Sequence, residues 1–177
     1  MKEIEDRRSI RKYKDKKVPI ETINLLIESG NQAPSGNNSQ PWHFIIVDDE
    51  KIKDKIVTVS NNQKWMRTAP VFLVCIADLS VRNKDENIEL FEDSSLPELK
   101  KIIRDSAIAI EHIVLEAVHQ ELGTCWVAWF DQKHIRPVLG IPLNKYVVSV
   151  LTIGYADENP PKRKRKPIEE IVHYNKW

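Results

Sequence analysis

The feature that most constrains the fold is an unbroken apolar run from Val71 to Ala77, bounded by Pro70 and Asp78. A strand with one face in water alternates apolar and polar residues, whereas this run has no polar position. It therefore predicts a strand buried on both faces, in a sheet that helices cover. Other strands are predicted at 42–47, 124–130 and 146–154, and helices at about 19–29, 49–59 and 97–122, the last stopped by Gly123.

The chain has 177 residues, and we expect a single domain over 1–177. Hydrophobic residues make up 41% and charged residues 30%, which is typical of a globular protein. The net charge of +1 creates no overall field that would attract nucleic acid, so any basic site must be local. The charged first residues lack the apolar core of a signal peptide, and no apolar stretch approaches the ~20 residues that cross a bilayer. We therefore expect a cytoplasmic protein with no membrane partner.

Conventional catalytic and metal-binding sets are missing. The five histidines lack metal-ligand spacing, so no metal is expected. The five glycines form no phosphate-binding motif, so side chains must hold any nucleotide. Cys75 and Cys125 lie in apolar runs and are interpreted as buried thiols, with a disulfide between them as the alternative. An enzyme without such groups can still work if a bound cofactor supplies the chemistry.

A cluster of arginines lies near the start of the chain, in Arg7-Arg8-Ser9-Ile10-Arg11. Guanidinium groups bind phosphate through paired hydrogen bonds, and the serine hydroxyl can donate to a phosphate or ribityl oxygen. The alternative is a solvated charged face.

The loop from Pro34 to Pro41 carries hydroxyls and amides but no charge. Two prolines stiffen it between a predicted helix and a predicted strand. It would suit a flat heterocycle that has both donor and acceptor edges. The alternative is a plain helix-to-strand turn.

A basic run, Lys162 to Lys166, lies between prolines at 160, 161 and 167. Alone it would be typical of a nucleic-acid patch. The prolines favour an extended arm instead, in which Arg163 and Arg165 would face the same side. The apolar and aromatic tail that follows would embrace a partner subunit or pack back on its own chain.

Taken together, these segments resemble the nitroreductase family of FMN flavoproteins. They occur in the family order over nearly the whole chain. The most specific piece is the loop from Pro34-Ser35 to Pro41-Trp42, within the matching segment Ala33–Phe44. The other matching segments are Arg7–Arg11, Leu122–Trp126, Leu139–Pro142, Ile153–Tyr155 and the basic run ahead of Ile168-Glu169-Glu170.

The resemblance implies an α+β fold with a central, mostly antiparallel sheet flanked by helices. It also implies an intertwined homodimer with C-terminal arm exchange and two FMN sites in the interface. On the phosphate side, the family pattern assigns Arg7, Arg8, Arg163 and Arg165 to the phosphate, Ser9 to the phosphate or ribityl chain, and Arg11 to the N1–O2 edge of the flavin.

On the flavin side, family members often have glycine near Ala128, so this chain departs from the pattern there. The family's middle contact is matched only loosely, by Asn62 to Lys64. The resemblance has Pro34, Ser35, Gly36, Asn38 and Gln40 reach the flavin from the other subunit, Asn62 make the middle contact, and Trp126, Val127 and Ala128 lie beside the ring with a backbone N–H pointing at N5.

The expected mechanism is ping-pong: NADH or NADPH gives hydride to flavin N5, and a small acceptor such as a nitroaromatic or quinone then takes it. No side chain is expected to be catalytic. The acidic segment 79–95 is interpreted as an excursion or lid that shapes the acceptor pocket. The alternatives are a dehalogenase or flavin-fragmenting member of the superfamily, a non-catalytic FMN-binding protein, or a nucleic-acid protein using the basic run.

Overall fold

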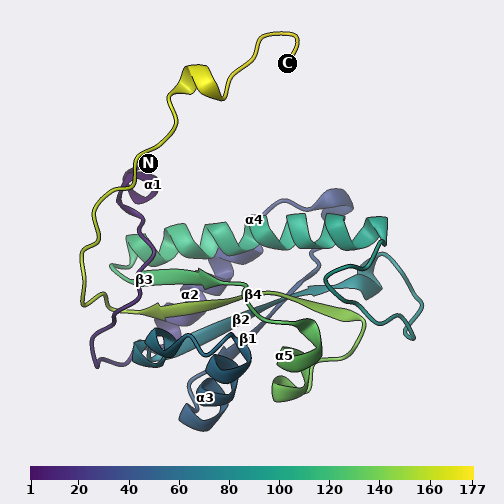
Figure 1. The fold of residues 1–177 in the computed structure, drawn as a ribbon, viewed down its shortest axis with the longest axis horizontal. Helices are drawn as coiled ribbons and strands as arrows, with labels where there is room; N and C mark the ends of the chain where they lie inside the picture. Colours follow the sequence, from purple (N-terminus) through teal and green to yellow (C-terminus); the bar gives the residue numbers. More distant parts are fainter.

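The computed structural model describes residues 1–177 and contains one four-stranded sheet. All neighbouring strands are antiparallel, in the order β1-β2-β4-β3. Figure 1 shows the sheet as a central layer with helices on both sides. The strands are β1 (Trp42–Val47), β2 (Val71–Asp78), β3 (Gly123–Val127) and β4 (Lys145–Gly154).

Strand β2 lies in the interior of the sheet, between β1 and β4, and all of its residues are buried. Because successive side chains of a strand point to opposite faces, β2 contributes to both cores. The prediction of a strand buried on both faces is confirmed. Leu73, Cys75 and Ala77 belong to one hydrophobic cluster, and Phe72, Val74 and Ile76 to the other.

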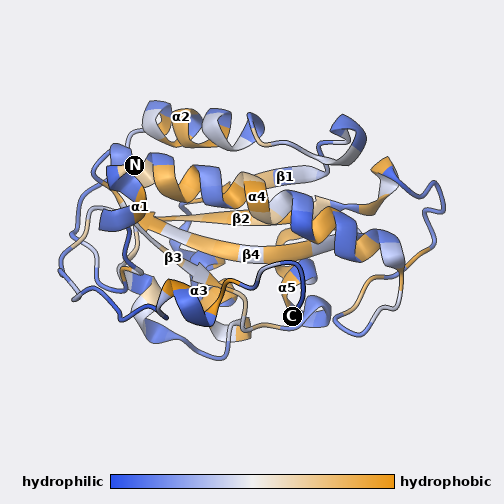
Figure 2. Cartoon of the chain, turned by 90° about the horizontal axis from the view of Figure 1, so that it is seen from above, coloured by the Kyte–Doolittle hydropathy of each residue, from blue (hydrophilic) through white to orange (hydrophobic).

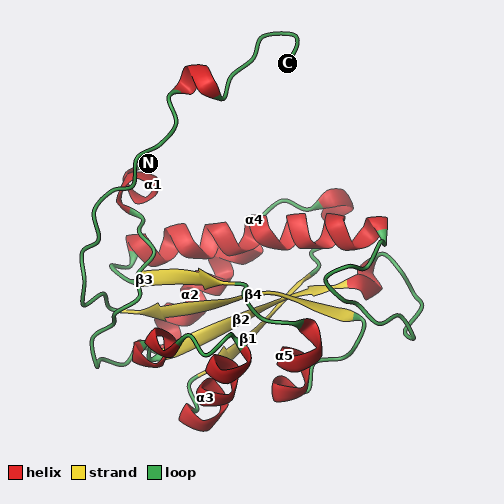
Figure 3. Cartoon of the chain, in the orientation of Figure 1, coloured by secondary structure: helices red, strands yellow, loops and turns green.

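Helices α2 and α4 pack on one face of the sheet, and α3 and α5 on the other (Figure 3). In Figure 2, β2 and β4 are apolar along most of their lengths, beneath the long helix α4. The predicted α+β architecture, an antiparallel sheet flanked by helices, is confirmed. The helices are α1 (Lys2–Asp6), α2 (Ile20–Asn31), α3 (Glu50–Val59), α4 (Pro97–His119) and α5 (Gln132–Leu139). None has the length and hydrophobicity that a membrane crossing needs.

Two predicted boundaries near β3 are wrong. The long helix ends at His119 rather than at 122, and Gly123 is the first residue of β3 rather than a helix stop. Glu121 makes the turn, with a φ of 58°. The predicted strand 124–130 ends at Val127, where its pairing with β4 ends.

The N-terminal segment crosses the ends of β3 and β4. Ser9 forms a parallel bridge with Thr124, and the Ile10 N–H donates to the Thr124 carbonyl over 2.9 Å. Tyr13 forms an antiparallel bridge with Ala156, and its buried hydroxyl donates to the Ile10 carbonyl over 2.7 Å. These contacts hold the arginine cluster in a defined place against the sheet.

Two glycines make this docking possible. Gly123 and Gly154 face one another in the β3–β4 pair. A Cβ on Gly123 would lie 2.6 Å from Cγ1 of Ile10, and one on Gly154 would lie 2.9 Å from Cδ1 of Tyr13. The sheet therefore lacks side chains at the point where the N-terminal segment crosses it.

The C-terminal tail leaves the body of the molecule as an arm (Figure 1). Every residue from Pro161 to Trp177 is exposed, so the alternative that the tail packs back on its own core is wrong. The arm contains a short 3-10 turn, Ile168–Glu170. Its exposed large hydrophobic residues are Ile168, Ile171, Val172, Tyr174 and Trp177.

The acidic segment 79–95 is an excursion that is anchored to the body. Leu90 is fully buried within the core on the α4 side. The Glu92 carboxylate accepts from the Gln132 N–H over 2.6 Å, and Glu89 lies 3.4 Å from the buried guanidinium of Arg136. These contacts tie residues 89–92 of the segment to α5.

Replacing Gly123 with alanine tests the docking of the N-terminal segment. The added methyl would overlap Ile10, and overpacking of this kind costs about 1–3 kcal/mol. We expect Gly123→Ala to lower the free energy of unfolding by that amount, measured by denaturant titration. Hydrogen exchange should also become faster at the amides of residues 10 to 13.

Gly140→Ala is the matched control. Gly140 has a φ of +63° but no heavy atom within 4 Å of the added Cβ, so its cost is backbone strain alone, about 1 kcal/mol. In Gly140→Ala, hydrogen exchange at the amides of residues 10 to 13 should stay at the wild-type rate. Equal hydrogen-exchange rates in Gly123→Ala and Gly140→Ala would contradict the proposed overlap with Ile10.

A buried carboxylate closes the end of β2. The Asp78 side chain is 8% exposed and contacts Lys145 and His43, and it accepts from the Ser80 N–H over 2.8 Å. Burial by itself would raise the pKa of Asp78, but the hydrogen bonds from Lys145, Ser80 and His43 outweigh it and lower the pKa to about 2. The charged form of Asp78 therefore stabilises the folded chain.

This pKa predicts an acid-sensitive contribution to stability. Because the folded pKa lies below the ordinary value of 3.8, the contribution is complete above about pH 4 and is lost as the pH falls through about 2. We expect it to be about 2 kcal/mol. Asp78→Asn should remove it, so the difference in unfolding free energy between wild type and variant should shrink between pH 4 and pH 2. A difference that stays constant over this range would contradict the assignment.

Candidate functional site

Cationic side chains from both ends of the chain line one cavity of about 420 Å³. It lies between the segment that follows α1 and the arm that follows β4. The chain has a net charge of only +1, so this concentration of positive charge is local. One carboxylate, that of Glu5, lines the cavity, and the cationic lining residues are Arg7, Arg8, Arg11, Lys162, Arg163 and Arg165.

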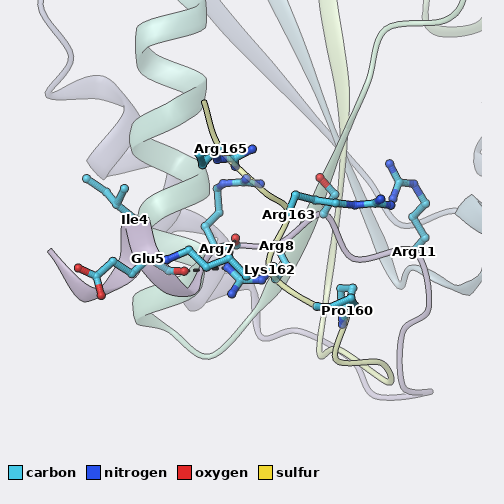
Figure 4. A pocket seen from close by; sticks show the side chains of 11 residues that line it. Ile4, Glu5, Arg7, Arg8, Arg11, Pro160, Lys162, Arg163 and Arg165 are labelled. Atoms are coloured by element: carbon cyan, nitrogen blue, oxygen red, sulfur yellow. Dashed lines mark hydrogen bonds between the residues drawn. The ribbon is translucent and has the colours of Figure 1, made fainter. Parts of the chain in front are cut away.

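Figure 4 shows how these side chains lie. Arg163 extends toward Arg11, and Arg165 lies beside Arg7. Arg8 is oriented from within the chain, because its Nη1 donates to the carbonyls of Glu5 and Arg7 over 2.7 and 2.8 Å. Ser9 lines the same cavity. The structure thus brings together the N-terminal and C-terminal arginines that the sequence analysis selected for a phosphate.

Two neighbours of Arg11 were missed in the sequence analysis. The Arg11 guanidinium lies 5.7 Å from the centre of the Trp65 ring, in a cation–π contact. Its backbone N–H donates to the carboxylate of Glu158. Neither partner belongs to a local motif, so only the folded chain reveals them. Arg11 therefore both lines the cationic cavity and contacts the Trp65 ring.

Strand β3 is the edge strand next to this cavity. The Thr124 carbonyl points outward, since it accepts from Ile10. Backbone groups alternate along an antiparallel strand, so the N–H of Trp126 points the same way, away from β4. Trp126 is 39% exposed and Ala128 is exposed, while Val127 is buried. This edge therefore offers the Trp126 N–H as a backbone donor and one exposed aromatic side chain, on the strand that the arginine-bearing N-terminal segment crosses.

The turn after α3 holds Asn62, with a φ of 53°. Its neighbour Asn61 donates through Nδ2 to the carbonyl of Trp129 over 2.9 Å. The turn is therefore tied to the segment that follows β3. Asn62 itself is exposed, and it does not line the arginine cavity.

The loop between α2 and β1 has an unusual backbone. Asn37, Asn38 and Gln40 all have positive φ, at 57°, 52° and 45°. Each such residue costs roughly 1 kcal/mol, although asparagine tolerates this region better than most residues. The Gln40 N–H donates to Ser35 Oγ over 2.9 Å, which helps to hold the turn. The loop is therefore more strongly shaped than a plain helix-to-strand turn.

This loop lies at the other end of α4 from the cavity (Figure 1). Gly36 contacts Asp105, whereas Glu3 of α1 contacts His119. These two positions of α4 are about 20 Å apart along the helix axis. Within one chain, Pro34, Ser35, Gly36, Asn38 and Gln40 are thus not brought to the arginines.

An ion pair that the sequence analysis missed holds the loop. Asp105 of α4 is 2% exposed, and its Oδ2 accepts from the Gly36 N–H over 3.1 Å and from Arg82 Nη2 over 3.0 Å. Arg82 Nη2 also lies 3.0 Å from the Gly36 carbonyl and 3.2 Å from Ser39 Oγ. A buried aspartate in an otherwise apolar helix face was the available signal.

Neither cysteine is activated as a nucleophile. Burial raises the pKa of the Cys125 thiol, and it raises the pKa of Cys75 to about 12, so both thiols stay protonated at neutral pH. Both cysteines are free, so the alternative of a disulfide is wrong. No group of three His, Cys, Asp or Glu side chains is placed to hold a metal ion.

Comparison with known proteins identifies the family. The family model described as "Nitroreductase family" matches residues 4–63 and 57–155. The chain belongs to the nitroreductase family.

Individual relatives of this nitroreductase-family chain have different names. It is 30% identical to the FMN reductase [NAD(P)H] of Bacillus subtilis over 98% of its length and 72% of that protein. It is 27% identical to the iodotyrosine deiodinase of Thermotoga neapolitana, over 96% and 94% of the two chains. Among solved structures, it resembles the NADPH:FMN oxidoreductase of Vibrio harveyi in complex with NAD+, with a TM-score of 0.87 and 25% identity over 99% and 76% of the chains.

Proposed function

We propose that this chain is an FMN-dependent oxidoreductase that transfers hydride from NADH or NADPH to a small acceptor such as a nitroaromatic or quinone. We propose further that residues 1–177 form one FMN-binding domain. The observation that carries the proposal is the cavity in which arginines from both ends of the chain meet. The names of the relatives support NAD(P)H-dependent oxidoreductase activity and FMN as the flavin.

The donor set of the cavity fits a phosphate. Six cations repel one another unless an anion neutralises them, and a phosphate monoester supplies close to two negative charges. Arg7, Arg8, Arg163 and Arg165 would hold this phosphate through paired hydrogen bonds, with Ser9 as an additional donor. No glycine-rich loop is needed, since side chains supply the donors.

The ring would then lie along the outer edge of β3. The outward N–H of Trp126 supplies a donor for the ring, next to Val127 and Ala128. Arg11 would lie near the N1–O2 edge, where a cation stabilises negative charge. When bound, FMN supplies the hydride chemistry itself, by accepting hydride at N5 and passing it to the acceptor. The side chains of this chain bind and orient, and none is assigned as an acid, base or nucleophile.

A second copy of the chain would complete the site. The loop from Pro34 to Gln40 contacts α4 at Asp105, about 20 Å along the helix axis from the contact between α1 and His119, so it would reach a flavin in the partner subunit rather than in its own chain. The exposed apolar residues of the arm, from Ile168 to Trp177, would pack on that partner, because exposed apolar clusters of this kind favour association. We therefore propose a homodimer with arm exchange and two FMN sites.

Reductive dehalogenation is a second candidate reaction. The iodotyrosine deiodinase relative covers nearly the full chain, at 27% identity. The same phosphate and ring contacts would serve such an enzyme, and only the acceptor pocket would differ. The nucleic-acid alternative receives less support, because Arg163 and Arg165 line the same cavity as the N-terminal arginines rather than a separate exposed patch. The non-catalytic alternative receives less support because the relatives are named as enzymes.

The flavin is the first test. Purified protein should be yellow, and denaturation should release FMN rather than FAD. Steady-state kinetics with NADH and NADPH, against nitroaromatic, quinone and halotyrosine acceptors, should give parallel double-reciprocal lines if the mechanism is ping-pong. Colourless protein that cannot be reconstituted with FMN would overturn the proposal, and turnover of halotyrosine alone would favour the second candidate.

The arm arginines give a matched pair of variants. Arg163→Ala with Arg165→Ala removes two charged donors from the cavity and should raise the Kd for FMN roughly 100-fold. Lys164→Ala with Lys166→Ala removes the same charge at adjacent positions that do not line the cavity. It should change the Kd by no more than about threefold, since screened surface charges contribute little. Fluorescence titration gives both constants, and equal losses in the two variants would contradict the assignment.

A further inference from the structure

We propose that Arg82 and Asp105 are positioning residues that hold the loop Pro34–Gln40 in the shape that receives the flavin. The inference rests on the proposed function, because it assigns the loop to the FMN site. Neither residue lines the arginine cavity, so both act through the loop backbone.

Asp105 and Arg82 form hydrogen bonds with the backbone N–H and carbonyl groups of Gly36. Asp105 Oδ2 accepts from its N–H, and Arg82 Nη2 donates to its carbonyl oxygen. A Cβ on Gly36 would lie 2.7 Å from Arg82 Nη2 and 3.6 Å from Asp105 Oδ2. A side chain at this position would therefore displace Arg82. Because the N–H and carbonyl of Gly36 are both hydrogen-bonded within the chain, Gly36 fixes the conformation of the loop, and the neighbouring residues are left to contact the flavin.

Burial strengthens the electrostatic attraction between Arg82 and Asp105. The side chains of Arg82 and Asp105 are 16% and 3% exposed, so water screens their attraction weakly. Removing one partner would leave a buried charge without compensation. The ion pair also connects three separate elements, since Arg82 lies in segment 79–95, Asp105 in α4 and Gly36 in the loop.

The pair can counter the backbone strain of the loop. Three residues with positive φ follow Gly36 within four positions, and their conformation needs support from outside. Arg82 Nη2 reaches Ser39 Oγ as well, so the support covers the middle of the turn. Ser35 and Asn38, on either side of Gly36, are then presented in a fixed relation to one another.

Arg104 provides a matched control. It lies 3.4 Å from Asp105 Oδ1, at the same helix turn, but its side chain is 65% exposed and has no hydrogen bond to the loop. Arg82→Gln and Arg104→Gln thus remove the same charge beside the same carboxylate. Only the first removes a contact with the loop.

The experiment measures hydrogen exchange of the loop amides in FMN-free protein, and the affinity of the protein for FMN. In FMN-free protein, hydrogen exchange at the amides of Gly36 and Gln40 should be roughly tenfold or more faster in Arg82→Gln than in wild type. The Kd for FMN, from fluorescence titration, should rise roughly tenfold or more. The loop loses the hydrogen bonds from the charged Arg82 side chain that hold it in the shape that receives the flavin. Arg104→Gln should leave both quantities within about twofold of wild type.

Two further variants separate positioning from a general loss of stability. Arg82→Lys keeps the charge but not the planar fork, and should recover part of the FMN affinity. Asp105→Asn combined with Arg82→Gln should cost less than the two single changes together, since they disrupt one network. The near-ultraviolet and visible circular dichroism of bound FMN should change in Arg82→Gln at saturating flavin, which a merely less stable protein would not show.

The outcomes are distinguishable. Wild-type loop exchange in Arg82→Gln, or faster exchange with an unchanged Kd for FMN, overturns this inference and leaves the proposed function standing. Wild-type protein that binds no FMN overturns the proposed function and the flavin role of the loop with it. Equal effects of Arg82→Gln and Arg104→Gln would show that the loss of one positive charge beside Asp105, and not the loss of a contact with the loop, weakens FMN binding. That result would also overturn the inference.

Discussion

The burial of β2 on both faces is the constraint on which the rest of the structure depends. An eight-residue strand with no exposed position must lie in the interior of a sheet, between two layers of helices. In this sheet β1 and β4 are its neighbours, and β3 lies at the edge beyond β4. The candidate site is built on that edge, because only an edge strand has backbone donors to offer and room for another segment to cross beside it.

The electrostatics of the site follow from where the two ends of the chain are held. Ser9 and Tyr13 pin the N-terminal segment to β3 and to the residues after β4, and the arm leaves from the same place. Six cations are thereby gathered in a molecule whose net charge is +1. Such a cluster is costly without an anion, and this cost supports the proposal that a phosphate binds there.

The opposite end of α4 depends on a different interaction. There a strained loop is held by one buried carboxylate and one arginine, far from the arginine cavity in the same chain. Dividing the site between two ends of one chain makes sense if two copies associate, because each copy would then offer a phosphate-binding end and a loop. The exposed apolar arm gives that association a physical cause.

The sequence by itself determined the elements and the residue classes. Unbroken apolar runs and β-forming residues placed β1, β2 and β4 within a few residues, and helical spacing of apolar residues placed most of α4, since these patterns act between near neighbours in the chain. The sequence also selected both arginine groups and the loop, because phosphate and flavin recognition require those residue types. Tertiary structure decided the rest: where the arm goes, that Gly123 is a packing glycine and not a helix stop, and that Trp65, Glu158, Arg82 and Asp105 belong beside the predicted residues. Those contacts join residues 23 to 147 positions apart, and no local pattern encodes which distant side chains will meet.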